Sequence, residues 1–140
     1  MGRWLIGAGV ALGLALLVVG VARSEVEPGR SETVQVVSSQ KLPNVPGKSV
    51  SAVVVSYAPG GKSGKHHHAG SVLAYVLTGE IRSENSATGP AKVYKAGESF
   101  FEPAGCEHLV SENASATEPA KFLVVFVAPK GATLTEYTSH

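Results

Sequence analysis

From residue 33 onward, short runs of apolar and β-branched residues are separated by segments rich in glycine, proline, asparagine and serine. Some runs alternate between polar and apolar positions and others are continuously apolar, which are the two patterns of partly and fully buried strands. None of them keeps a helical period of 3.6 residues. The chain is therefore expected to be all-β, with seven or eight strands in an antiparallel double-sheet jelly-roll barrel. The predicted strands are residues 33–38, 49–58, 71–81, 91–94, 99–102, 107–110 and 121–128.

The first 22 residues have a different pattern. Residues 4–22 form an unbroken apolar run that follows Arg3. An export signal has an apolar region of about 7–15 residues and a membrane span needs roughly 20, so the run is interpreted as a hydrophobic helix serving as a cleaved signal or as a membrane anchor. Cleavage after Ala22 would suit a signal peptidase. Residues 23–32 then form a polar linker and residues 33–140 the barrel, which is expected to lie outside the cytoplasm.

Composition narrows the class of function. With 140 residues the chain has room for one domain beyond the apolar run. Lys and Arg number 12 against 11 for Asp and Glu, so no basic footprint for nucleic acid is present. Cys106 is the single cysteine, which excludes an internal disulfide and a thiolate metal cluster.

The histidines carry the clearest chemical signal. Four of the five occur in two places, as His66-His67-His68 and as His108. Alternate residues of a strand point to the same face, so His66 and His68 would point inward together while His67 faces solvent. Neutral imidazole is the commonest protein ligand for divalent transition metals. Together with His108 from a distant segment, the pair predicts a three-nitrogen metal site.

Two motifs around these histidines resemble those of the cupin superfamily, in particular its small single-domain members. The first cupin motif is a glycine, five residues, His-x-His, a glutamate three or four residues later, and a closing glycine. Gly60, His66, His68 and Gly79 match it. The second motif, Gly-x5-Pro-x-Gly-x2-His, is matched by Gly97, Pro103, Gly105 and His108, and its final asparagine comes one residue late, at Asn113. The likeness covers residues 53–128.

Some features of both motifs also have a direct physical reason. Gly79 can take a positive φ in a tight turn between two strands. Pro103 and Gly105 set a second turn that would aim His108 inward. In a jelly-roll barrel, the two histidine-bearing strands would face a small interior that holds one ion or ligand.

The chain departs from the cupin pattern at one ligand. The resemblance implies a glutamate as fourth metal ligand, but Val72 occupies the matching position and Leu73 follows it. Three outcomes are open: a three-histidine site similar to that of cupins that oxidise thiols or diketones with ferrous iron, a substitute carboxylate from elsewhere, or loss of the metal. Three neutral imidazoles would leave the ion its full charge and favour an anionic or chelating ligand. Lys62 and Lys65 could attract such a ligand, although loop lysines are usually only solvated.

Glu102 is the best substitute for the missing carboxylate. It directly precedes Pro103, where cupins usually carry an apolar residue, and follows Phe100 and Phe101. An acidic residue at a position that is usually apolar often marks a functional site. If Glu102 faces inward, it could bind the metal or act as a general base. The competing interpretation is a solvated strand end that faces outward.

The expected function is metal-dependent chemistry on a small molecule. The metal is expected to be a single divalent transition ion, most naturally Fe(II), with Mn, Ni or Zn as alternatives, and a dioxygenase-like oxidation is the most natural reaction for an open iron site. Two alternatives come from other classes: a small-ligand or metal-binding envelope protein without catalysis, and a metal-free barrel that serves dimerisation. The resemblance also implies a homodimer, because cupins often pair through edge strands and unpaired strand edges need cover.

Overall fold

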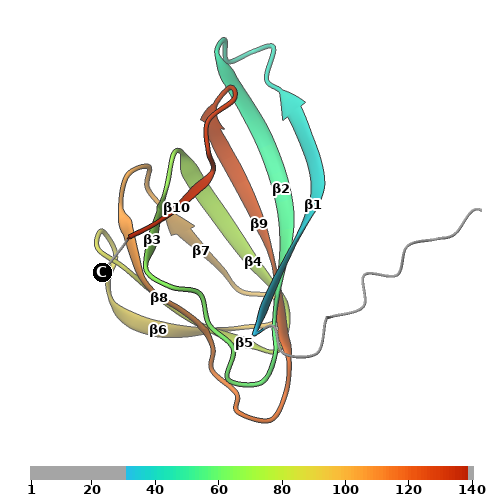
Figure 1. Cartoon of the computed structure of the whole chain (residues 1–140), viewed down its shortest axis with the longest axis vertical. Coiled ribbons are helices and arrows are strands. Elements are labelled where there is room, and N and C mark those ends of the chain that lie inside the picture. The colour runs from blue at the N-terminus through green and yellow to red at the C-terminus, as the bar shows by residue number, and fades with distance from the viewer. Residues whose placement is uncertain (1–30, 139–140) are drawn as a thin grey trace, which may run out of the picture.

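The computed structural model describes residues 31–138, which form ten β-strands in two five-stranded antiparallel sheets (Figure 1). The prediction of an all-β double-sheet fold is confirmed. Within this part of the chain, no helix is long and apolar enough to cross a membrane. The predicted hydrophobic helix of residues 4–22 lies outside the described residues, as does the linker up to residue 30.

The first sheet provides the apolar wall of the molecule. Its alternation is strict: in the second strand Val53, Val55 and Tyr57 are buried, and the residues between them are only partly so. β-Branched residues suit such a pleated surface, because their side chains pack against neighbours on the same face. In spatial order the strands are β1 (Glu32–Lys41), β2 (Lys48–Tyr57), β9 (Ala120–Pro129), β4 (Ser71–Thr78) and β7 (Ser99–Glu102).

The second sheet places mainly polar side chains on its inner face. Its buried residues are histidines, serines and asparagines, with Ile81 as the buried hydrophobic residue. In spatial order the strands are β10 (Thr135–Tyr137), β3 (His66–His68), β8 (Glu107–Asn113), β5 (Glu80–Asn85) and β6 (Gly89–Lys95).

Aromatic side chains pack together in the core between the sheets. Phe122 of β9 packs with its ring centroid 5.5 Å from that of Tyr57 and 6.4 Å from that of Phe100. Tyr94 of the second sheet reaches Phe100 at 4.8 Å. Aromatic contacts at these distances are favourable beyond the area they bury, so this cluster ties the two sheets together.

The structure has ten strands where seven ranges were predicted, because one predicted strand is divided in two and two short strands were left out of the predicted ranges. The predicted strand of residues 71–81 is two strands, β4 and β5, which turn at Gly79 with φ of +72°. A Cβ at this position would lie 2.7 Å from the carbonyl oxygen of Pro119, so glycine is required by both the backbone conformation and the available space. The three-residue strands β3 and β10 were missing from the predicted ranges, because His66–His68 and Thr135–Tyr137 are too short to stand out as apolar or alternating runs.

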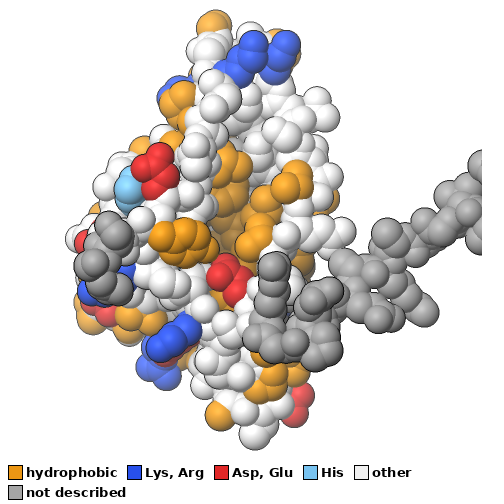
Figure 2. All heavy atoms as spheres, in the orientation of Figure 1, with side chains coloured by type: hydrophobic (Ala, Val, Ile, Leu, Met, Phe, Trp, Pro, Cys, Tyr) orange, Lys and Arg blue, Asp and Glu red, His pale blue; other side chains and the backbone are white. Residues whose placement is uncertain are grey.

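The sandwich is open along the side between its edge strands β1 and β10. Val34 and Val36 of β1 pair with the inward-facing Val55 and Val53 of β2, yet they are 57% and 69% exposed. They share the inner face of the first sheet but are left largely uncovered. Figure 2 shows a hollow on this face whose floor is formed by hydrophobic side chains.

Candidate metal centre

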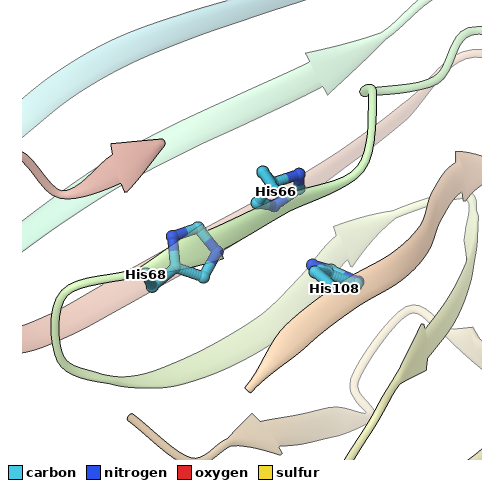
Figure 3. A group of neighbouring side chains, drawn as sticks. All are labelled: His66, His68 and His108. Atoms are coloured by element: carbon cyan, nitrogen blue, oxygen red, sulfur yellow. The ribbon is translucent and has the colours of Figure 1, made fainter. Parts of the chain in front are cut away.

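Two neighbouring strands bring the three predicted histidines together. His66 and His68 are both buried on β3, and His108 is buried on β8, where it pairs directly opposite His66 (Figure 3). His67 lies between them on the outer face, where it is exposed and contacts Glu136 at 3.3 Å. Gly105 has φ of +77° in the turn that precedes β8, as the motif required. The alternation argument for His66, His67 and His68 is confirmed.

The imidazole rings are close enough to share one ion. The ring centroid of His66 lies 4.8 Å from that of His68 and 4.9 Å from that of His108. One ring nitrogen from each histidine lies within 4.8 Å of the others. These three buried histidines could therefore bind a metal ion.

Each ring has one nitrogen that is engaged by a neighbour and one that is left for the interior. His66 Nδ1 donates to the carbonyl oxygen of Gly64 at 2.7 Å, and His68 Nδ1 donates to that of Leu134 at 3.0 Å. His108 Nε2 lies 2.9 Å from Ser83 Oγ. Hydrogen bonds of this kind fix ring orientation and tautomer in metal sites. They leave Nε2 of His66, Nε2 of His68 and Nδ1 of His108 as the free nitrogens.

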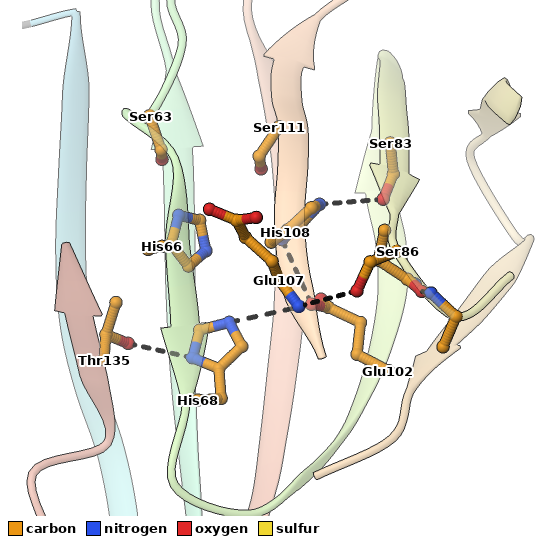
Figure 4. Close-up of polar contacts among 12 residues, drawn as sticks. Ser63, His66, His68, Ser83, Ser86, Glu102, Glu107, His108, Ser111 and Thr135 are labelled. Atoms are coloured by element: carbon orange, nitrogen blue, oxygen red, sulfur yellow. Dashed lines mark hydrogen bonds and ion pairs between the residues drawn. The ribbon is translucent and has the colours of Figure 1, made fainter. Parts of the chain in front are cut away.

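Glu102 points into the same space. It is only 2% exposed, so the interpretation of an outward-facing, solvated strand end does not hold. Its Oε2 lies 3.2 Å from His108 Nδ1 and 3.8 Å from His68 Nε2 (Figure 4). Among residues 31–138, Glu102 Oε2 and His108 Nδ1 are the buried side-chain atoms without a hydrogen-bond partner. Buried polar atoms are rarely left unpaired, and two that face each other beside two further nitrogens are suited to a cation.

The position of Glu102 explains how the carboxylate missing from the first motif can be replaced. Val72 is fully buried on β4, and its Cα partner on the neighbouring strand β7 is Glu102. Residues directly opposite each other in an antiparallel pair project from the same face of the sheet. β7 thus places the Glu102 carboxylate on the same face of the sheet as Val72, the residue at the motif's glutamate position.

Burial also sets the protonation states that a metal site needs. Desolvation, reinforced by the neighbouring histidines, lowers the pKa of His68 to about 4 and that of His108 to about 3, so both rings are neutral and able to coordinate at pH 7. Desolvation raises the pKa of Glu102 to about 7. A bound cation would favour the ionised carboxylate and offset that desolvation.

A pocket of about 180 Å³ opens beside the histidines and is called the central pocket below. One wall is apolar and is formed by β2 and β9. At one end, Tyr57 Oη lies 2.5 Å from Ser63 Oγ and 2.8 Å from Ser111 Oγ, and Ser63 Oγ donates to Glu32 Oε1 at 2.8 Å. Lys62 does not line this pocket. The residues lining the pocket are Glu32, Val34, Val53, Val55, Tyr57, Ser63, His66, His68, Glu102, His108, Ser111, Phe122, Val124, Phe126, Thr135 and Tyr137.

Several polar residues of the pocket and around the histidines were not predicted from the sequence. Ser83 lies two residues after the buried Ile81 on β5, and this alternation is the signal that could have identified it. Ser111 lies three residues after His108 and is buried because the pairing of β8 with β5 is irregular, so alternation would not have identified it. Tyr57 ends a run of buried valines, where it looks like a core residue. Glu32 was assigned to the linker, but β1 begins with it.

Solved structures that share this fold include proteins with different named activities. A protein with a double-stranded β-helix domain from Klebsiella pneumoniae is 24% identical to this chain, with a TM-score of 0.62. The match covers 83% of this chain and 90% of the Klebsiella chain. An oxalate oxidase is 22% identical to this chain, with a TM-score of 0.61. The match covers 80% of this chain and 57% of the oxalate oxidase chain. The DMSP lyase DddQ from Ruegeria pomeroyi is 22% identical with a TM-score of 0.54, over 64% of this chain.

At these identities the likeness shows the fold alone, and this chain spans less than half the length of the two DMSP lyases that it matches. No curated protein sequence matches it. The family described as "Cupin domain" matches residues 53–126, which is more than half of the chain and includes all three histidines and Glu102. Together with the two-sheet fold and the histidine geometry, this match shows that the chain belongs to the cupin superfamily.

Proposed function

We propose that the protein is a metal-dependent cupin that acts on a small molecule in the central pocket. His66, His68 and His108 hold one divalent transition metal, and Glu102 is the fourth ligand. The observation that carries the proposal is the pair of buried atoms without hydrogen-bond partners, Glu102 Oε2 and His108 Nδ1, which face the free nitrogens of the other two rings.

The donor set favours iron among the possible metals. Imidazole suits iron, nickel, zinc and copper, and a mixed nitrogen and carboxylate set with open positions is typical of non-haem Fe(II) sites. When bound, such an ion supplies open coordination positions where a ligand and dioxygen can meet, so a dioxygenase-like oxidation is the proposed reaction. Manganese, nickel and zinc are the alternatives that the same side chains could hold.

The residues of this chain have distinct roles in that proposal. The imidazoles stay neutral because burial lowers the pKa of His68 and His108. Glu102 reduces the net charge of the centre by one. The apolar wall from β2 and β9 excludes water from the ligand, which strengthens the electrostatic interactions at the centre.

Metal analysis tests the proposal. Full-length protein without a histidine tag, reconstituted anaerobically with Fe(II), should retain close to one equivalent of iron after gel filtration. Substituting His66→Ala should abolish retention, and Glu102→Gln should weaken affinity at least about tenfold. His67→Ala, which removes an exposed histidine from the same strand, is the matched control and should retain iron fully. A parent protein that retains no Fe(II), Mn(II), Ni(II) or Zn(II) would refute the proposal.

Oxygen uptake separates catalysis from binding alone. Iron-loaded protein that consumes dioxygen in the presence of a small ligand supports the oxidation. Stable iron without uptake would instead support the non-catalytic binding protein that the sequence left open.

Export and self-association are also proposed, from the sequence. The apolar run of residues 4–22 after Arg3 supports an extracytoplasmic location, free or membrane-attached. Fractionation of cells expressing the full chain, with and without residues 4–22, tests this, because loss of the run should leave the protein in the cytoplasm. Sedimentation of the purified protein tests the homodimer.

A further inference from the structure

We infer that the central pocket selects a compact, uncharged ligand with an apolar body and a hydroxyl or amino group, and that it disfavours anions. The inference rests on the proposed function in one respect, since it takes the pocket beside the metal centre as the ligand site. Size, charge and the direction of a hydrogen-bond chain support it.

The pocket suits a single ring. Its volume of about 180 Å³ is close to that of a cavity of about 150 Å³ that holds benzene in another protein. The wall opposite the histidines is formed by aliphatic and aromatic side chains that offer no hydrogen bonds. These are Val53, Val55, Phe122, Val124 and Phe126.

The charges around the pocket do not favour an anion. Its lining includes two carboxylates, Glu32 and Glu102, and among the described residues no lysine or arginine lines it. Lys62 and Lys65 line a second hollow, which shares Ser63 and Ser111 with the central pocket, but neither lysine lines the central pocket itself. A divalent ion with Glu102 and Glu32 gives a formal charge of zero, so the preference for anions expected of a three-histidine site is lost.

The hydroxyl groups at the end of the pocket form a chain whose direction is fixed by Glu32. Each hydroxyl has one proton to donate. Ser63 donates its proton to Glu32, so the hydrogen bond between Ser63 and Tyr57 must use the proton of Tyr57. Tyr57 then has none left, and its contact with Ser111 must use the proton of Ser111. The order of donation is Ser111 to Tyr57 to Ser63 to Glu32.

This direction leaves Ser111 Oγ as an acceptor for the ligand. Ser111 lines the pocket, and its side chain lies on the same side of β8 as His108 (Figure 4). Because its proton is already donated to Tyr57, the oxygen can only accept. A ligand hydroxyl or amine satisfies it, whereas a carbonyl or carboxylate brings a second acceptor and leaves both unpaired.

Four ring compounds of similar size test the selection. Full-length zinc-loaded protein is titrated with phenol, benzaldehyde, benzoate and toluene, and binding is followed by NMR. Phenol should bind about five- to tenfold more tightly than benzaldehyde or toluene, which is the effect of one net hydrogen bond, and benzoate should bind most weakly. Phenol that fails to bind at millimolar concentration, or benzoate that binds as tightly as phenol, would overturn the inference.

Glu32→Gln tests the direction of the chain. A glutamine amide can either donate to Ser63 or accept from it, so the direction is no longer fixed and the preference for phenol over benzaldehyde should fall about fivefold or more. Glu118→Gln makes the same charge change on an exposed loop and should leave the preference unchanged. An unchanged preference in Glu32→Gln would overturn the inference.

The same titrations on metal-free protein separate the two proposals. The chain from Ser111 to Glu32 contains none of the proposed metal ligands, so the preference for phenol should persist without zinc. Protein that binds no metal but keeps the preference would refute the proposed function and uphold the inference. Protein that binds metal but shows no preference for phenol would uphold the proposed metal site and refute the inference.

Discussion

The two sheets enclose the same interior but bury different chemistry. The buried residues of β2, β4, β7 and β9 are mostly valine, alanine and phenylalanine, whereas those of β3, β5 and β8 are histidine, serine and asparagine except for Ile81. One wall therefore supplies most of the hydrophobic stabilisation, and the other presents groups that can bind and orient. Glu102 is the charged exception, because it is a carboxylate that lies on the apolar sheet and faces the histidines of the other sheet.

This division implies that stability and ligand chemistry can be changed separately. A substitution in the apolar wall should reduce the free energy of unfolding with little effect on metal binding. A substitution among the polar groups of the opposite sheet should weaken metal binding with little effect on the free energy of unfolding. Four changes test the contrast, from the largest expected effect to the smallest.

Phe122→Ala should give the largest loss of stability. Phe122 is 4% exposed and contacts both Tyr57 and Phe100, so its removal leaves a cavity in the core. The free energy of unfolding should fall by about 3–5 kcal/mol, measured by urea denaturation. Phe101→Ala, at an exposed position of β7, is the control and should change it by about 0.5 kcal/mol or less. A loss below about 1 kcal/mol in Phe122→Ala would contradict the assignment of this wall as the core.

Glu102→Gln should stabilise the metal-free protein at high pH. Burial raises the pKa of Glu102 from 4.5 to about 7, so the folded state holds the proton more tightly than the unfolded state. The stability this carboxyl contributes is present below pH 4.5 and is lost as the pH rises to about 7. Between about pH 4 and pH 8, the stability difference should shift in favour of the variant by roughly 3 kcal/mol.

Urea denaturation in the presence of a chelator measures this shift. Glu118→Gln, on an exposed loop, should show a constant difference from the parent over the same range. With bound metal the sign should reverse, because the parent then gains a ligand that the variant lacks. A difference that does not change with pH would show that the Glu102 carboxyl is not desolvated.

Ser83→Ala should weaken metal binding without unfolding the protein. Its Oγ contacts His108 Nε2 at 2.9 Å and orients the ring. Loss of such an orienting group typically costs about tenfold or more in metal affinity. Competition with a chromophoric zinc chelator measures the affinity, and Ser99→Ala, at an exposed position of β7, should leave it unchanged. Equal affinity in Ser83→Ala and the parent would mean that the ring is held by its packing alone.

His67→Ala should have the smallest effect. Its side chain is exposed, and its contact with Glu136 lies at the surface. Surface ion pairs of this kind contribute about 0–1 kcal/mol, so thermal stability and zinc content should both stay close to those of the parent. Loss of metal in this variant would show that the wrong face of β3 had been assigned to the interior.

The sequence predicted the fold class and the shared face of His66 and His68 because both depend on local periodicity. The position of His108 depends on the pairing of β3 with β8, and it was predicted only through the resemblance to the second cupin motif. Alternation along β3 was sufficient to place His66 and His68 on one face. The orientation of Glu102 was left open, because it depends on the register between β4 and β7. That register places Glu102 opposite Val72 and is set by contacts between strands far apart in the sequence.

The remaining polar groups could not be predicted for a related reason. Tyr57, Ser63 and Ser111 meet only when β2, the segment before β3 and β8 converge at one end of the pocket. Neither their residue types nor their spacing identifies them. Glu32 was assigned to the linker because the polar residues around it hide the start of β1.

The shortness of β3 has a practical consequence for anyone handling this protein. The strand is three residues long and is held at one edge by β10, where Tyr137 pairs with His66 and the amide of Thr138 donates to the carbonyl oxygen of Lys65. An affinity tag fused directly after these residues, or a protease that trims them, would disturb the imidazoles before it affected the bulk of the molecule. Purification handles are better placed elsewhere.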